Sequence, residues 1–126
     1  MKVFANTDVG LVRQLNEDDY CIAHNANDEW MAIVCDGIGG AKAGEVASHT
    51  AVMTMYEAFM KSPVFEKDRQ VDNWIRENLN QANDFIYSKS LKNFNERGMG
   101  TTAVGVIKAH IGTFIFNVGD SRIYAD

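Results

Sequence analysis

The sequence contains almost no proline, few cysteines and no long apolar run. Of its 126 residues, one is proline and two are cysteine. No apolar stretch reaches the roughly 18 residues that a membrane-spanning helix requires. Residues 1–6 also lack the long apolar core of a signal peptide. These absences predict a soluble, cytoplasmic protein without a membrane partner.

The two cysteines, Cys21 and Cys35, lie in apolar segments that resemble strands, and they show no CxxC spacing. Unpaired cysteine packs as a small apolar side chain, and disulfides are rare in the cytosol. We therefore expect two reduced, buried thiols in place of a disulfide or a metal site.

Basic residues are the scarcer charge, since 12 Lys and Arg stand against 17 Asp and Glu, and the net charge is −5 at pH 7. No basic cluster stands out, which argues against a nucleic-acid binder. A phosphorylated substrate stays compatible with this charge, because a bound cation reverses the local field. The apolar share of 46% favours one packed domain over disorder.

Glycines are concentrated directly after one acidic residue. An apolar run at residues 31–35 ends at Asp36, and four glycines fall within residues 37–44. Glycine allows positive φ and lets a ligand approach the main-chain carbonyls. A carboxylate beside an exposed carbonyl offers hard oxygen ligands, which suit Mg²⁺ or Mn²⁺. A phosphate-binding loop is the weaker interpretation, because the GxxxxGK[ST] spacing is absent and the acid precedes the glycines.

A β-hairpin is indicated just before these glycines. Residues 20–24 and 30–35 have the composition of strands, and the polar segment 25–29 separates them. Pairing the two strands brings Asp18 beside Asp36 at one end of the sheet. Two carboxylates there would repel each other unless protons or cations compensate them. The hairpin therefore predicts a metal site.

The segment before the hairpin carries charges of both signs. Arg13 precedes three consecutive acids, which are Glu17, Asp18 and Asp19. A solvated loop is the simplest interpretation of such a charge run when it is considered alone. The planar guanidinium of Arg13 would partly neutralise the acids, and it also suits a phosphate group.

The remaining periodicity predicts two helices and three further strands. Apolar residues recur at helical spacing over 44–61, where Ser62 and Pro63 end the pattern, and again from about 68 to 92. Strand patterns cover 3–8, 101–107 and 113–118, with a turn near 109–110. The histidines show no i, i+4 pair, and we interpret them as packing or surface residues: His24, His49 and His110.

Another acid follows the last strand pattern. Asp120 comes directly after Gly119 and just past the strand pattern. It therefore repeats the arrangement of Asp36, an acid beside a glycine, at a second sheet edge. A tight turn explains this dipeptide equally well.

Several short motifs together resemble the bacterial metal-dependent Ser/Thr protein phosphatases of type 2C, the PPM family. The motifs are TDVG and NED within residues 7–18, DGIGG and GEVAS within 36–48, GTTA at 100–103 and NVGDSR at 117–122. Each motif is weak alone, whereas this order and spacing across nearly the whole chain is highly specific.

The resemblance implies an α+β fold, an antiparallel β-sandwich flanked by helices, with two Mg²⁺ or Mn²⁺ ions between the sheets. Water bridging the two ions would attack phosphoserine or phosphothreonine in line. The residues carried over are Asp36 as the bridging ligand, Gly37 through its carbonyl, Glu17 and Asp18 through metal-bound water, Arg13 on the phosphate and Asp120 at a third, weaker metal position. The implied partners are a phosphoprotein substrate and a Ser/Thr kinase or its targets.

Two departures from the family pattern stand out. Ile38 occupies the position where some members of the family have a histidine that could protonate the leaving group. Bacterial members resemble this chain in having an apolar residue there. The resemblance therefore implies that a metal-bound water protonates the leaving oxygen. The family's catalytic domain is also about twice this length, and its later half supplies two more aspartates. Asp72 and Asn73 have the same residue types as the family's last Asp-Asn pair, but they lie in a helical pattern and at the wrong place in the order of motifs.

The resemblance thus implies that residues 1–126 are the N-terminal half of a single catalytic domain. Such a half would be weakly active or inactive alone, and it would expose sheet edges and an apolar face. We expect one of three outcomes. A homodimer or strand-swapped assembly covers the exposed surfaces, the second half of the domain is missing, or the half-fold persists with rearranged helices. The alternative function is a non-catalytic module that binds a phosphoprotein or partner protein. A third, structural interpretation is that the acids are only solvated turns, but it must explain all five matching positions by chance.

Overall fold

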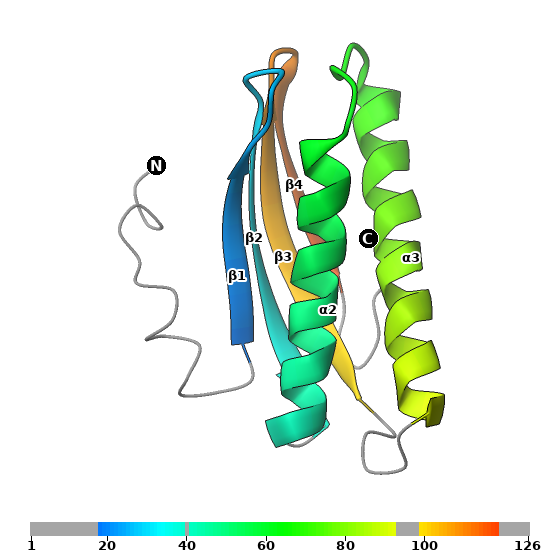
Figure 1. The fold of residues 1–126 in the computed structure, drawn as a ribbon. Coiled ribbons are helices and arrows are strands. Elements are labelled where there is room, and N and C mark those ends of the chain that lie inside the picture. The colour runs from blue at the N-terminus through cyan, green and yellow to red at the C-terminus, as the bar shows by residue number, and fades with distance from the viewer. Residues whose placement is uncertain (1–17, 40, 93–98, 119–126) are drawn as a thin grey trace.

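A computed structural model describes residues 18–39, 41–92 and 99–118 of the chain. These residues form four strands and two helices, an α+β arrangement that confirms the predicted class (Figure 1). In chain order the elements are β1 (Asp18–His24), β2 (Trp30–Ile38), α2 (Ala41–Met60), α3 (Asp68–Lys92), β3 (Gly100–Ala109) and β4 (Gly112–Val118).

The strands form one antiparallel sheet in the order β1-β2-β3-β4. The pairs β1–β2 and β3–β4 are hairpins of neighbouring segments, whereas both helices intervene between β2 and β3. The predicted hairpin is confirmed, and its register pairs Asp18 with Asp36 and His24 with Trp30.

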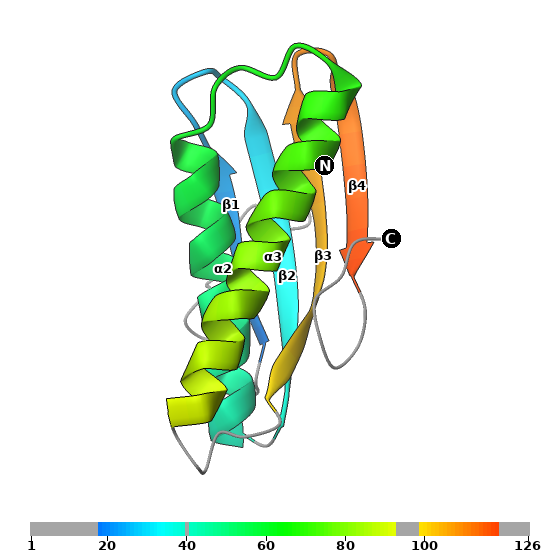
Figure 2. The same ribbon diagram turned by 90° about the vertical axis from the view of Figure 1, so that its right-hand side faces the viewer.

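Both helices cover the same face of the sheet (Figures 1 and 2). Helix α2 packs on β1, β2 and β3, and α3 packs against α2. The sheet-facing side of α2 consists of small residues toward its start and large ones toward its end: Ala43, Ala47, Ala51, Met55 and Phe59 are all buried. Because alanine takes little space, the first half of α2 can approach the strands closely.

Helix α3 follows the predicted pattern along its length. Its buried residues are those of the predicted apolar face: Val71, Ile75, Leu79, Ala82 and Ile86. The side chain of Gln70 accepts hydrogen bonds from the backbone N–H groups of Glu66 (2.7 Å) and Lys67 (2.9 Å), which closes the N-terminal end of the helix. Trp74 packs edge-on against Phe59 and Phe65, and this contact joins α3 to the end of α2.

The start of one helix differs from the sequence-based prediction. Helix α2 begins at Ala41, so Gly44 lies inside the helix and not at its start as predicted. Glycine disfavours a helix interior, which is why the sequence pattern favoured a later start. The strand predicted over residues 3–8 lies outside the described residues.

The sheet face away from the helices carries exposed apolar side chains. Side-chain alternation places Ile22, Trp30, Val104 and Ile115 on this face, and Ile115 is 78% exposed. The expectation of an uncovered apolar face therefore holds for the described residues. Among the described helices, none is long and apolar enough to cross a bilayer.

Hydrogen bonds from polar side chains connect two turns and the end of one helix at one end of the molecule. Asn25 donates to the Phe59 carbonyl (3.2 Å) and the Ser62 hydroxyl (3.3 Å), and Asn27 donates to the Ser62 carbonyl (2.8 Å). The ring of His110 donates from Nε2 to the Asn27 carbonyl at 2.7 Å. The β1–β2 turn, the β3–β4 turn and the end of α2 are thereby fixed relative to each other.

The two cysteines should be chemically inert in the folded protein. Both are free thiols, Cys35 buried and Cys21 partly buried. Burial, with a smaller contribution from the charge of Asp19, raises the pKa of Cys21 to about 12 and also raises the pKa of Cys35. Since the thiolate is the reactive form, we expect negligible reaction of either thiol with a disulfide reagent at pH 8 and full reaction in denaturant. Rapid labelling of the native protein would contradict this burial.

Candidate functional site

Two acidic residues are paired at the end of the sheet opposite the β1–β2 and β3–β4 turns. Asp18 starts β1, Asp36 lies near the end of β2, and the two residues are directly paired across the strands. Directly opposed residues in an antiparallel pair have Cβ atoms about 4.5–5.5 Å apart. Both side chains belong to the face away from the helices, and Asp36 is exposed. The predicted convergence of Asp18 and Asp36 is therefore confirmed.

The chemistry of this pair suits a hard cation. Like charges directly opposite each other destabilise a sheet, and a divalent ion removes that cost while using the carboxylate oxygens as ligands. Two carboxylates are nevertheless an incomplete ligand set. Within the described residues, no group of three or more His, Cys, Asp and Glu side chains converges on one point. Asp18 and Asp36 thus fit part of a Mg²⁺ or Mn²⁺ site.

Three of the residues implied by the family resemblance cannot be placed. Arg13, Glu17 and Asp120 lie outside the described residues, so their roles stay predictions. Asp72, by contrast, lies on the exposed side of α3, where its carboxylate accepts a hydrogen bond from Nε of Arg76 at 3.0 Å. This local pair agrees with the sequence argument that Asp72 lies apart from the acidic cluster.

Gly37 brings the backbones of β2 and α2 into direct contact. A Cβ added to Gly37 would lie 2.0 Å from the carbonyl oxygen of Gly44 and 2.7 Å from its Cα. The sequence reasoning attributed these glycines to ligand access, whereas the structure adds a packing reason for Gly37. Gly39 has φ of 117°, a conformation that favours glycine, and it ends the strand before α2.

Thr101 holds the backbone of the acidic strand from the neighbouring strand. Its hydroxyl oxygen lies 3.2 Å from the Asp36 carbonyl and 2.8 Å from the Thr102 carbonyl, and the side chain is fully buried. Sequence reasoning gave Thr101 no role. Its only signal was its place in the GTTA motif, because a hydroxyl that bonds across strands has no periodic signature.

Asp19 has an environment different from that of its acidic neighbours. Its side chain is buried and points toward α2, where Oδ2 lies 2.9 Å from Nδ1 of His49. An ionised carboxylate only accepts, so Nδ1 is the donor. Oδ1 accepts a bond from the Tyr20 backbone N–H at 2.8 Å. Asp18 and Asp19 therefore lie on opposite faces of β1. His49, interpreted from sequence as a packing or surface residue, has a specific partner.

Comparison with known proteins identifies relatives for nearly the whole chain. Residues 10–126 match the sequence profile of the family described as Protein phosphatase 2C. The serine/threonine phosphatase stp of Listeria monocytogenes is 36% identical over 118 residues, which cover 94% of this chain and 47% of that protein. Protein phosphatase PhpP of Streptococcus pneumoniae is 31% identical over 123 residues, covering 98% and 49%. The chain thus spans about half the length of these relatives.

Solved structures show the same fold. The serine/threonine phosphatase Stp1 from Staphylococcus aureus superposes with a TM-score of 0.75 at 36% identity, over 83% of this chain and 41% of that one. The serine/threonine phosphatase PstP/Ppp of Mycobacterium tuberculosis superposes with a TM-score of 0.65 at 27% identity, over 91% and 45%.

The contact between β2 and α2 predicts a strong effect of adding one methyl group. Gly37→Ala should lower the free energy of unfolding by about 1–3 kcal/mol, because the new Cβ meets backbone that cannot rotate away. Gly105→Ala is the comparison, since the two atoms nearest to its added Cβ belong to the side-chain ring of Phe116, and the nearest backbone atom, the Ala32 carbonyl oxygen, lies farther away at 2.9 Å. Urea unfolding of both variants measures the difference. A smaller loss for Gly37→Ala than for Gly105→Ala would contradict this view of the contact.

Proposed function

Because the chain belongs to the protein phosphatase 2C family, we propose that the intact protein hydrolyses phosphoserine and phosphothreonine on proteins, using Mg²⁺ or Mn²⁺. The relatives are named serine/threonine phosphatases, but the chain covers only about half of each. The observation that carries the proposal is the direct pairing of Asp18 with Asp36 at one end of the sheet.

The proposed ligand set follows from this pairing and from the family resemblance. Asp36 would bridge two ions and the carbonyl of Gly37 would bind one of them, while Glu17 and Asp18 would act through water and Asp120 at a third position. When bound, the ions would activate a water molecule for attack on phosphorus and stabilise the charge that develops there.

The remaining chemistry belongs to the chain's own residues. Arg13 would bind the substrate phosphate and stabilise charge on its equatorial oxygens. Ile38 has no proton to transfer, so it takes no part in protonating the leaving oxygen. Thr101 and the Gly37–Gly44 contact hold the strand that carries Asp36, and a fixed ligand loses less entropy on binding.

We further propose that residues 1–126 form the N-terminal half of one catalytic domain. The exposed apolar face of the sheet, with Ile22, Val104 and Ile115, would then be covered by the rest of that domain. A homodimer or strand-swapped assembly would cover the same face in a preparation of this chain alone. The proposed substrate is a phosphoprotein of the cytoplasm whose phosphate a Ser/Thr kinase adds.

The first test replaces the bridging carboxylate. Asp36→Asn in the full-length protein should reduce hydrolysis of a phosphothreonine peptide by about 100-fold or more and weaken Mn²⁺ binding, because the side chain loses its charge but keeps its shape. Asp72→Asn is the matched control, since Asp72 pairs with Arg76 on the exposed side of α3.

Turnover and calorimetric Mn²⁺ binding are measured for both variants, with far-UV circular dichroism as the check on folding. Full activity in Asp36→Asn, or wild-type activity that survives removal of divalent ions, would refute the proposal. Mn²⁺ and phosphopeptide binding without turnover would instead support the non-catalytic module.

The second test concerns the phosphate-binding cation. Arg13→Ala should mainly raise KM for a phosphopeptide, with a smaller effect on kcat, since the guanidinium is proposed to bind the phosphate before the reaction. Arg76→Ala removes an arginine whose partner is Asp72, so it should leave both constants unchanged. An unaltered KM in Arg13→Ala would reassign Arg13 to a structural role.

A further inference from the structure

His49 and Asp19 link the helix layer to the strand that carries Asp18. The carboxylate of Asp19 uses both oxygens, one toward Nδ1 of His49 at 2.9 Å and one toward the Tyr20 backbone N–H at 2.8 Å. The Asp19 side chain is 7% exposed, whereas that of His49 is 57% exposed. The bond is therefore partly shielded from water on the acid side and open on the histidine side.

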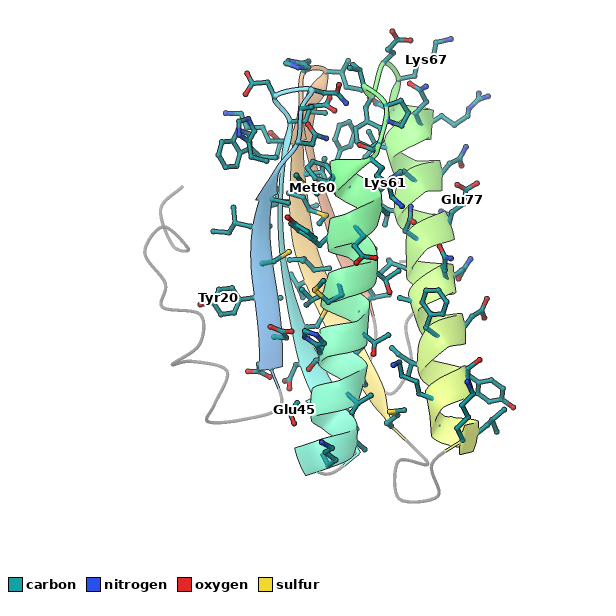
Figure 3. The ribbon with its side chains drawn as sticks, viewed as in Figure 1. Tyr20, Glu45, Met60, Lys61, Lys67 and Glu77 are labelled. Carbon is teal, nitrogen blue, oxygen red and sulfur yellow. The ribbon has the colours of Figure 1, made fainter. Side chains whose placement is uncertain are left out.

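The position of Asp19 connects this bond to the candidate site. Asp19 pairs with Cys35 in the sheet, so both Asp19 and Cys35 are immediate neighbours of the paired acids Asp18 and Asp36. Successive side chains on a strand point to opposite faces. Figure 3 shows Tyr20 on the side of β1 away from α2, and Asp19 accordingly faces the helix. One peptide bond separates a side chain held by the helix from a proposed metal ligand.

The helix that supplies His49 is itself fixed on the other acidic strand. Gly44 of α2 touches Gly37 of β2 through backbone atoms, and Gly37 follows Asp36. His49 lies little more than one turn further along the same helix. The two contacts therefore set β1 and β2 against one rigid element, each at the residue next to an acid.

We propose that His49 is a positioning residue that fixes the spacing of Asp18 and Asp36 by holding Asp19 against α2. The His49–Asp19 bond opposes displacement of β1 relative to α2, and Asp18 is part of β1. The inference rests on the proposed function, since it assigns a role in preparing the same metal site. It concerns residues that the ligand set does not include.

The pocket beside the bond makes the substitution experiment practical. Asp19 and His49 line a pocket of about 250 Å³ together with Val52, Met53 and Tyr56 of α2. His49 is thus at a half-open rim and not in the close-packed core, so a smaller side chain there leaves the core intact.

The variants separate positioning from helix stability. His49→Ala removes the donor and has the higher helix propensity, whereas His49→Asn keeps an amide donor close to the place of Nδ1 and has the lower propensity. We expect Mn²⁺ affinity to fall by about 10-fold in His49→Ala, and to return to within about 3-fold of the wild type in His49→Asn. The thermal midpoint of each variant is measured separately, so that a loss of Mn²⁺ affinity can be told apart from a loss of folding.

His24→Ala is the matched control. His24 also pairs with an aspartate, at 2.7 Å from Asp28, but both side chains are exposed and lie in or beside the turn at the far end of β1. Losing this pair should leave Mn²⁺ affinity unchanged. The measurements are calorimetric Mn²⁺ titration, kcat and KM with a phosphothreonine peptide, and the thermal midpoint of the full-length protein.

Three results would overturn the inference: unchanged Mn²⁺ affinity in His49→Ala, an equal loss in His24→Ala, or no recovery in His49→Asn. If the wild type binds Mn²⁺ and turns over while these results are found, only the role of His49 fails. If the wild type neither binds Mn²⁺ nor hydrolyses the peptide, the proposed function fails and the inference fails with it.

Discussion

The backbone contact between Gly37 and Gly44 is the constraint on which the rest of the structure depends. At this point β2 and α2 approach so closely that Gly37 has no room for a side chain toward the backbone of Gly44. The approach sets the separation of helix and sheet, and the buried alanines at 43, 47 and 51 fit that separation. It also brings the turn of α2 that carries His49 to the level of Asp19. The placement of the acidic strand against α2 therefore depends on a steric requirement at Gly37.

Much of the fold follows from periodicity in the sequence. The apolar residues of α3 recur at helical spacing, and the same residues are buried in the structure. The two apolar segments on either side of the polar residues 25–29 predict the hairpin, and the hairpin alone is sufficient to pair Asp18 with Asp36. These features are local, so a short window of sequence contains the information that specifies them.

The contacts that could not be foreseen join residues far apart in the chain. The start of α2 at Ala41 places Gly44 in a helix interior, because packing against Gly37 outweighs the low helix propensity of glycine. The His49–Asp19 bond spans 30 positions and the Asn25–Ser62 bond spans 37. Neither pair belongs to a repeating pattern, and each becomes visible only once the helices and strands are placed in space.

The order of the strands along the chain has a consequence for folding. The two acids lie in one hairpin, which closes over a short turn, whereas β3 joins β2 only after both helices have been made. Closing a short loop costs less entropy than closing a long one, so the local pair forms more readily. The segment that carries Asp18 and Asp36 also precedes Thr101 in the chain, so a ribosome delivers the hairpin of the two acids before it delivers the residue that holds the acidic strand from β3.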